Sequence, residues 1–218
     1  MNNAIADLMP DAVLERLIFR YPLLSSSKEE IEKAYEILCE CYESKNKLLI
    51  CGNGGSASDS EHIVGELMKS FSKKRCLKQM IKDRLNETSP ELGSQLAEFL
   101  QPALPAIALT NHAALNTAFS NDVDPFLIFA QQVLGYGNKG DVLMGISTSG
   151  NAKNVLNAMV TAKALGLKTI GLTGKTGGGF NNYCDIVIHV DATTTPEIQE
   201  LHLPVYHALC QMLEEHFF

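Results

Sequence analysis

The feature that most constrains the fold of this chain is an apolar run that ends in a glycine-rich turn. Residues 47–51 (KLLIC) predict a strand, residues 52–59 read GNGGSASD, and a helical pattern occupies residues 58–71. A strand that leads through such a turn into a helix begins a strand–helix–strand unit. The turn leaves backbone N–H groups uncovered beside a helix N-terminus, which suits a phosphate.

The same turn also has a plainer interpretation. Glycine-rich strand-to-helix turns occur in many α/β proteins only because glycine permits close packing. Ala57 stands where a dinucleotide-binding fingerprint requires its third glycine. His62 and Glu66 lie on one face of the following helix, but the same spacing is common in surface pairs. The turn alone therefore leaves a structural and a functional interpretation open.

Short apolar strands alternate with helices through the rest of the chain. Further strands are predicted at residues 105–110, 141–146, 168–172 and 185–190. Helices are predicted at residues 11–20, 27–44, 58–71, 75–84, 90–100, 125–134, 151–165 and 197–216, with a short one capped by Asn111 and running through 118. This alternation is typical of a parallel sheet covered by helices on both faces. No repeat or linker divides the chain, so one domain is expected.

Composition excludes several classes of protein. The net charge of −7 argues against nonspecific nucleic-acid binding, and no apolar run approaches the length of a membrane span. The N-terminus lacks the basic start and apolar stretch of a signal peptide, so we expect a cytoplasmic protein. The six cysteines include no CxxC pair and are expected to be reduced and mostly buried.

Four loops should meet at one edge of the sheet, because the carboxyl ends of parallel strands gather there. They are residues 52–59, 110–122, 147–151 and 173–179. Ser147, Thr148 and Ser149 bring three consecutive hydroxyl groups to a helix start, where one would be enough for a cap, so phosphate binding is favoured. Residues 173–179 do not form a nucleotide P-loop, since Thr169 stands where its first glycine is required.

Four segments, in order, resemble the sugar isomerase (SIS) domain: CGNGGSASDSEHIVGEL, GISTSGN, GLTGKTGG and EIQELHLPVYHAL. Within that superfamily they are similar to phosphoheptose isomerases, which interconvert sedoheptulose 7-phosphate and a heptose 7-phosphate. The resemblance implies one SIS domain over residues 1–218, a three-layer α/β/α sandwich with a five-stranded parallel flavodoxin-like sheet. The helices within 11–44 would serve oligomer packing. Residues 73–103 are predicted to be a charged helical insertion that the best-known family members lack, and we expect it to lid the site or to extend an oligomer interface.

The resemblance also implies a set of site residues. Glu66 and His207 would be the catalytic pair, and one zinc ion would be held by His62, Glu66, Gln199 and His207. Substrate contacts would come from Asn53, Gly54, Gly55, Ser56, Glu66, Asn121, Asp122, Ser147, Thr148, Ser149 and Gln199. The family is similar in forming homotetramers with sites at subunit interfaces. His202 has no matching role and is expected to be structural or exposed.

The chemistry of this set is consistent with aldose–ketose isomerisation through an enediol. Glu66 suits the base that takes a carbon-bound proton, and His207 suits the acid that serves the oxygens. A zinc ion would polarise the carbonyl. On a straight helix Gln199 and His207 are about 12 Å apart along the axis. They can therefore meet one ligand only by leaning together or from different subunits.

Some positions depart from the family pattern and leave the sugar open. Ala152 replaces a phosphate-binding serine, Pro196 and Glu197 replace an Asp-Arg pair, and Lys69 lies beside the position of an expected basic residue. One alternative is a non-catalytic SIS scaffold similar to tetramers that bind replication initiators, which lack a histidine at the position of His207. The other is a sugar-sensing regulator, but no basic helix-turn-helix pattern is present.

Overall fold

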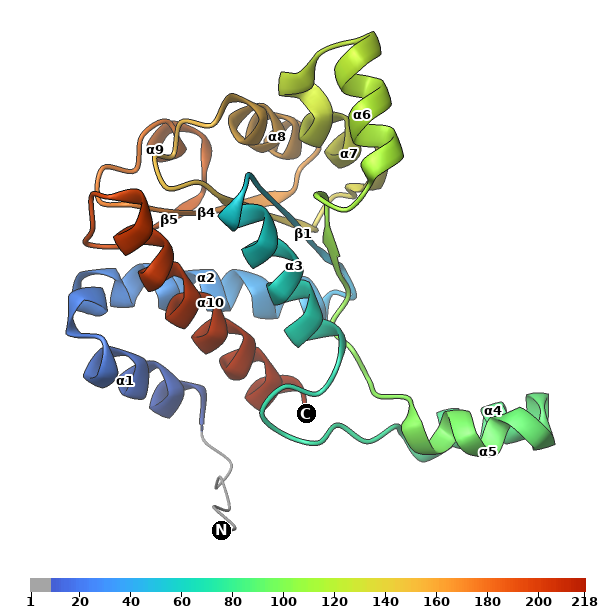
Figure 1. Cartoon of the computed structure of the whole chain (residues 1–218). Helices are drawn as coiled ribbons and strands as arrows, with labels where there is room; N and C mark the ends of the chain where they lie inside the picture. The colour runs from blue at the N-terminus through green and yellow to red at the C-terminus, as the bar shows by residue number, and fades with distance from the viewer. Residues whose placement is uncertain (1–8) are drawn as a thin grey trace.

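A computed structural model, which describes residues 9–218, has a five-stranded parallel sheet at its centre (Figure 1). The strands are β1 (Leu48–Gly52), β2 (Ala106–Ala108), β3 (Val142–Ile146), β4 (Lys168–Thr173) and β5 (Ile186–His189). Their order is β2-β1-β3-β4-β5, with β1 paired to β3 from Leu48↔Val142 to Gly52↔Ile146. This is the flavodoxin-like order, and its direction reverses beside β1. The predicted fold class is confirmed.

Helices cover both faces of the sheet. One face carries α1 (Pro10–Arg20), α2 (Lys28–Glu43), α3 (Gly55–Met68) and α10 (Thr195–Phe217). The other carries α7 (Ile128–Tyr136), α8 (Lys153–Ala164) and α9 (Phe180–Tyr183). The connecting segments include the 3-10 helices η1 (Pro22–Ser27) and η2 (Pro125–Leu127), and the helix α6 (Ala113–Asp122).

Alternation along the buried strands divides the core in two. Leu48 and Ile50 of β1 face the larger cluster with α2, α3 and α10, whereas Leu49 and Cys51 face the smaller cluster with α7 and α8. Successive side chains of a strand point to opposite faces, so β1 must be apolar throughout. The cysteines are free thiols, and four of the six are buried. No helix within residues 9–218 is both long and apolar enough to cross a membrane.

Several predicted boundaries need correction. The helix expected at 58–71 begins at Gly55, because Gly54 has φ +56° and turns the chain directly into the helix. Asn111 does not cap α6, which follows His112 and runs on to Asp122. Asn121 and Asp122, expected in a loop, therefore end a helix. The helix expected at 151–165 begins at Lys153, and no side chain caps it.

The insertion folds as a helical hairpin of α4 (Gln79–Thr88) and α5 (Pro90–Phe99). The two helices pack closely, since a Cβ atom on Gly93 would lie 2.3 Å from the backbone oxygen of Leu85. Figure 1 shows the hairpin extending away from the sheet and its covering helices. Within one chain it therefore does not cover the strand ends as a lid, and a role at an interface between chains stays a prediction.

A buried ion pair fastens the segment after α3 to α10. Glu214 Oε1 accepts from Arg75 Nε at 2.8 Å, and both side chains are fully buried. The backbone N–H groups of Phe71, Ser72 and Lys73 also donate to the Glu214 carboxylate. Burial by itself would raise the pKa of Glu214, but the hydrogen bonds from Ser72, Phe71 and Arg75 hold that pKa below its usual value.

Removing this carboxylate should destabilise the protein strongly. Glu214→Ala leaves the Arg75 guanidinium buried without its partner, which costs about 3–5 kcal/mol in the free energy of unfolding. Urea unfolding followed by circular dichroism measures the change. Glu43→Ala is the matched control, because Glu43 pairs with His216 at the surface and its loss should cost less than about 1 kcal/mol. Equal losses in the two variants would contradict the structural role of the buried pair.

Candidate active site

The candidate site lies where α10 packs along α3. Tyr206 of α10 is the residue that joins them, since its side chain is buried and its hydroxyl reaches two residues of α3. It lies 3.0 Å from His62 Nδ1 and donates to Asp59 Oδ1 at 3.2 Å. A hydrogen bond at Nδ1 fixes the orientation of an imidazole and leaves Nε2 available for a ligand or a proton.

Two basic side chains contact the Glu66 carboxylate, one from α3 and one from the residue that follows it. Its Oε1 atom is 3.2 Å from His62 Nε2, and its Oε2 atom is 3.1 Å from Lys69 Nζ. The Glu66 carboxylate is mostly buried, with 12% of its side chain exposed, whereas Lys69 is exposed. Lys69, which lies beside the position of the expected basic residue, therefore does reach Glu66 from the C-cap position of α3.

His207 completes the cluster from α10. Its Nε2 atom lies 3.5 Å from His62 Nε2, and its ring packs against the rings of Tyr206 and Phe71. Burial lowers the pKa of His207, the nearby His62 lowers it further, and Glu66 offsets part of this change. His207 is therefore a neutral imidazole near pH 7, able to accept a proton or to bind a ligand through its lone pair.

The donor atoms of this cluster are of the kinds that zinc prefers. The imidazoles of His62 and His207 and the carboxylate of Glu66 lie close to one another. The Tyr206 hydroxyl contacts His62 Nδ1, the ring nitrogen that does not face Glu66 and His207. The side chains are not preassembled around a point, because no group of three or more His, Cys, Asp or Glu residues within 9–218 is placed to hold a metal ion as it stands.

Gln199 lies beside the start of α3, whereas His207 lies beside its middle. Its amide packs against the first residue of α3, so that a Cβ atom on Gly55 would be 2.6 Å from Gln199 Nε2. No hydrogen bond within the described chain joins it to His62, Glu66 or His207. Since α10 runs beside α3, Gln199 meets the start of α3 and His207 meets its middle. One chain thus brings together three of the four predicted metal ligands.

Hydrogen bonds join the first predicted phosphate loop, at residues 52–59, to the helix that follows the second, at residues 147–151. Asn53, directly after β1, exchanges two side-chain hydrogen bonds of 2.9 Å with Asn154 in the first turn of α8. Gly54 and Gly55 are exposed beside it at the start of α3. Ser56 is 4% exposed and is buried in the first turn of α3, so it is not on the open side of this loop.

The second loop carries the three hydroxyl residues, and the loop at 173–179 closes on it. Ser147 is buried, Thr148 is partly exposed and Ser149 is exposed. Gly150 has φ +65°, and a Cβ atom there would lie 1.9 Å from the backbone oxygen of Gly177. Only glycine permits this approach, so residues 173–179 shape the edge of the site as predicted.

Asn121 and Asp122 are not brought to this cluster by the chain itself. Both are exposed in the last turn of α6, where Asn121 Nδ2 donates to Asp122 Oδ1 at 2.9 Å. No hydrogen bond in residues 9–218 connects either residue to the loops at 52–59 or 147–151. Figure 1 shows α6 beyond the ends of the strands, at the margin of the molecule.

Sequence reasoning missed three residues that build the site: Asp59, Tyr206 and Phe71. Tyr206 precedes the predicted catalytic histidine, and Asp59 lies three residues before His62, so helical spacing could have indicated both. Phe71 could not have been found in this way, because it reaches His207 only through the segment that Glu214 anchors.

His202 is fully buried between α10 and the sheet, which confirms a structural position and excludes an exposed one. Neither ring nitrogen has a hydrogen-bond partner within the described chain. Burial lowers the pKa of His202 to about 4, and the nearby backbone of Thr173 offsets only part of this shift. The ring is therefore packed as a neutral group.

Comparison with known proteins places this site in a class. The family model described as "SIS domain" matches residues 22–85 and 83–174. A phosphoheptose isomerase of Nitratiruptor sp. is 43% identical over 182 residues, covering 83% of each chain. The solved phosphoheptose isomerase of Francisella tularensis is 31% identical with a TM-score of 0.71, covering 94% of this chain and 95% of that one. The corresponding structure from Neisseria gonorrhoeae is 31% identical with a TM-score of 0.67, covering 92% and 97%.

This chain is a protein of the SIS domain class, as its parallel sheet, the loops after β1 and β3 and the match to the family model together indicate. Within that class, the chain belongs to the phosphoheptose isomerase family, since its relatives are about 40% identical over most of its length.

The buried His202 predicts a loss of stability in acid. Between pH 6.5 and about 4 the unfolded chain binds a proton at this residue and the folded chain does not, so the free energy of unfolding falls by about 3 kcal/mol. In His202→Leu this part of the loss should be absent. Urea unfolding at pH 7 and pH 4.5 measures it, with His112→Leu as a control that keeps His202. An unchanged pH dependence in His202→Leu would contradict the assignment.

Proposed function

We propose that the chain is a phosphosugar aldose–ketose isomerase that interconverts sedoheptulose 7-phosphate and a heptose 7-phosphate. The observation that carries the proposal is the meeting of Glu66, His62 and His207 at the contact of α3 and α10. A carboxylate and a neutral imidazole are the groups that enediol chemistry requires. The relatives named phosphoheptose isomerase support the same reaction and substrate.

The roles of the two groups follow from their surroundings. Glu66 takes the proton from the carbon beside the carbonyl, and it is held for this by His62 and Lys69. His207 moves a proton between the two substrate oxygens, because its lowered pKa keeps the imidazole neutral and able to accept. Glu66 then returns its proton to the neighbouring carbon. The net change is a carbonyl moved by one carbon with no oxidant or reductant.

The substrate phosphate is proposed to bind between the two joined loops. Asn53, Gly54 and Gly55 offer amide groups at the start of α3, and Ser147, Thr148 and Ser149 offer hydroxyl and N–H groups after β3. No serine or threonine side chain caps α8, which leaves these hydroxyls for a ligand. Ala152 is its N-cap residue and adds no hydroxyl there.

We also propose a zinc ion in the site, held by His62, Glu66 and His207 with Gln199 as a weaker ligand. The donor types fit, and the Tyr206 hydroxyl orients His62 as residues behind metal ligands commonly do. When bound, zinc would polarise the substrate carbonyl. Gln199 would join the set by a change of rotamer or from another subunit.

We propose that the chain forms a homotetramer in the cytoplasm, and two observations support the homotetramer. Asn121 and Asp122 lie apart from the other substrate residues of the same chain, so a neighbouring subunit would have to supply them. Apolar side chains are exposed at Phe19 on α1, at Leu115 on α6 and at Val123 directly after α6.

Replacing the catalytic pair should remove turnover but leave the fold intact. Turnover of sedoheptulose 7-phosphate is expected to fall by about 10²–10⁴-fold in Glu66→Gln and in His207→Ala. Glu61→Gln, on the same helix, is the control and should retain activity. Adding zinc or a chelator to the wild-type enzyme tests the metal. A folded wild-type protein that binds the sugar phosphate without turnover would favour the alternative of a non-catalytic SIS scaffold.

Tyr206→Phe should impair catalysis through His62. The variant keeps the packed ring but loses the hydroxyl that orients the imidazole, so kcat should fall by about 10–100-fold with a smaller change in KM. Steady-state kinetics measures both constants, and thermal unfolding checks that the fold is retained. Tyr183→Phe, at an exposed tyrosine, is the control. A Tyr206→Phe enzyme with wild-type kcat would show that the hydroxyl does not position His62.

A further inference from the structure

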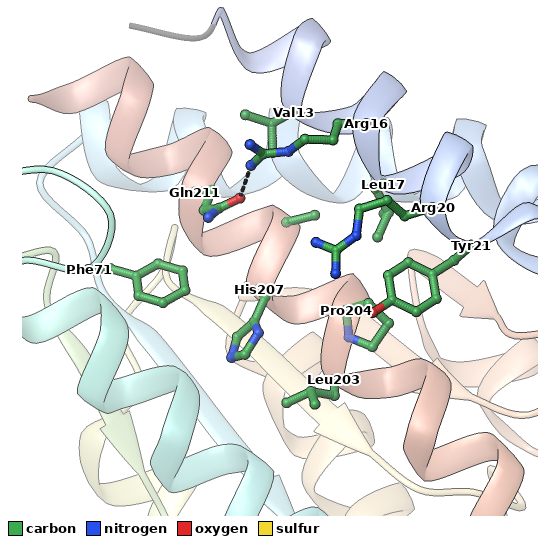
Figure 2. Close-up of a pocket in the computed structure, with 11 residues that line it drawn as sticks. Val13, Arg16, Leu17, Arg20, Tyr21, Phe71, Leu203, Pro204, His207 and Gln211 are labelled. Atoms are coloured by element: carbon green, nitrogen blue, oxygen red, sulfur yellow. Dashed lines mark hydrogen bonds between the residues drawn. The ribbon is translucent and has the colours of Figure 1, made fainter. Parts of the chain in front are cut away.

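A groove of about 150 Å³ lies between α1 and α10 and shares His207 with the candidate active site (Figure 2). Its polar lining comes from Arg16, Arg20 and Tyr21 on one side and from His207 and Gln211 on the other. Phe71, which packs against the His207 ring, also lines it. The groove therefore reaches the same histidine that the cluster on α3 reaches, but from the side of α1.

Two arginines place positive charge in this groove. Arg16 and Arg20 are four residues apart on α1, and Figure 2 shows both guanidinium groups extending across the groove toward α10. Arg16 Nη2 donates to Gln211 Oε1 at 2.9 Å, and the Arg20 guanidinium lies 5.4 Å from the Tyr21 ring centre. Both arginines retain donors that these contacts do not use, because a guanidinium carries five.

The positive charge of the groove is not neutralised by the described chain. Neither Arg16 nor Arg20 forms an ion pair with a carboxylate of residues 9–218, although the protein has a net charge of −7. By contrast, Lys69 is paired with Glu66, and Lys175 is paired with Asp191. Two unpaired guanidinium groups beside an imidazole, in a concave site, are suited to an oxyanion.

We propose that Arg16 and Arg20 form an oxyanion-binding subsite beside His207. Two sources could supply this chemistry. The first is the reacting substrate: when Glu66 removes the carbon-bound proton, the C–H electron pair forms the carbon–carbon double bond. The carbonyl electron pair then moves to oxygen, which becomes negative next to His207. The second source is a separate phosphate group that binds in the groove.

The first source rests on the proposed isomerase function, and it gives the arginines a role in catalysis. Positive groups fixed in place near a developing oxyanion stabilise it more than they stabilise the neutral substrate. Losing them should therefore lower kcat more than it raises KM. The second source does not require the isomerase reaction, because it predicts only that a phosphate occupies the groove.

The kinetic arm compares Arg20→Gln and the double variant Arg16→Gln/Arg20→Gln with the wild-type enzyme on sedoheptulose 7-phosphate. Arg84→Gln is the matched control, since it removes the same charge from an exposed position on α4. If the oxyanion belongs to the substrate, kcat falls by about 10–100-fold in the double variant, KM changes by less than about threefold and Arg84→Gln is unaffected. Arg20→Gln retains the Arg16–Gln211 bond, so it tests the site even if the double variant unfolds.

The binding arm titrates the same proteins with inorganic phosphate by isothermal calorimetry. If a separate phosphate is the ligand, the wild-type protein and Arg84→Gln bind one more phosphate per chain than the double variant, which keeps only the site at the loops after β1 and β3. Unchanged kcat together with unchanged phosphate stoichiometry would overturn the subsite. A wild-type protein that does not turn over sedoheptulose 7-phosphate would contradict the proposed reaction on that sugar instead, and the phosphate titration would then decide the subsite alone.

Discussion

The contact between α3 and α10 is the constraint on which the candidate site depends. Neither helix carries the site alone, because Glu66 and His62 come from α3 and His207 comes from α10. Two polar contacts hold the helices in register: the Tyr206 hydroxyl at the middle of α10 and the Glu214 carboxylate near its C-terminal end. Polar groups buried in this way are costly unless all are paired, so they specify one alignment of the two helices where apolar packing alone would tolerate several.

The same constraint links stability to chemistry. Arg75 pairs with Glu214 and also donates to the backbone oxygens of Leu67 and Glu66. The C-terminal end of α3, which includes the proposed catalytic residue Glu66, is therefore held by Arg75. Phe71, in the segment between them, packs on the His207 ring. Glu66 and Phe71 are therefore held in place by an ion pair that takes no part in the reaction itself.

Local rules made most of the fold predictable. The buried strands are continuous apolar runs and the loops after them are rich in glycine, serine and asparagine, so both the parallel sheet and its functional edge followed from the sequence. Helix starts were less predictable, because Gly54 begins α3 by its backbone conformation and not by a capping side chain. The partners of Glu66 and His207 depended on tertiary contacts that no local pattern records, as with Phe71. The direction in which the insertion extends could not be predicted either, because hydrophobic periodicity predicts its two helices but not how their hairpin is oriented relative to the sheet.

Three predicted site residues bear on the question of whether one subunit holds the whole site: Gln199, Asn121 and Asp122. The resemblance to phosphoheptose isomerases would require these residues to meet His62 and Ser147. Within residues 9–218 Gln199 packs against Gly55, and Asn121 donates to Asp122, with no hydrogen bond from any of the three to His62 or Ser147. Gln199 lies on α10, which is packed in the core, whereas Asn121 and Asp122 end α6, none of whose residues is buried. A site assembled from more than one subunit, as proposed above, would satisfy the resemblance without a change in this fold. The open surface at Gly65 on α3, one residue before Glu66, leaves room for a neighbouring chain to approach.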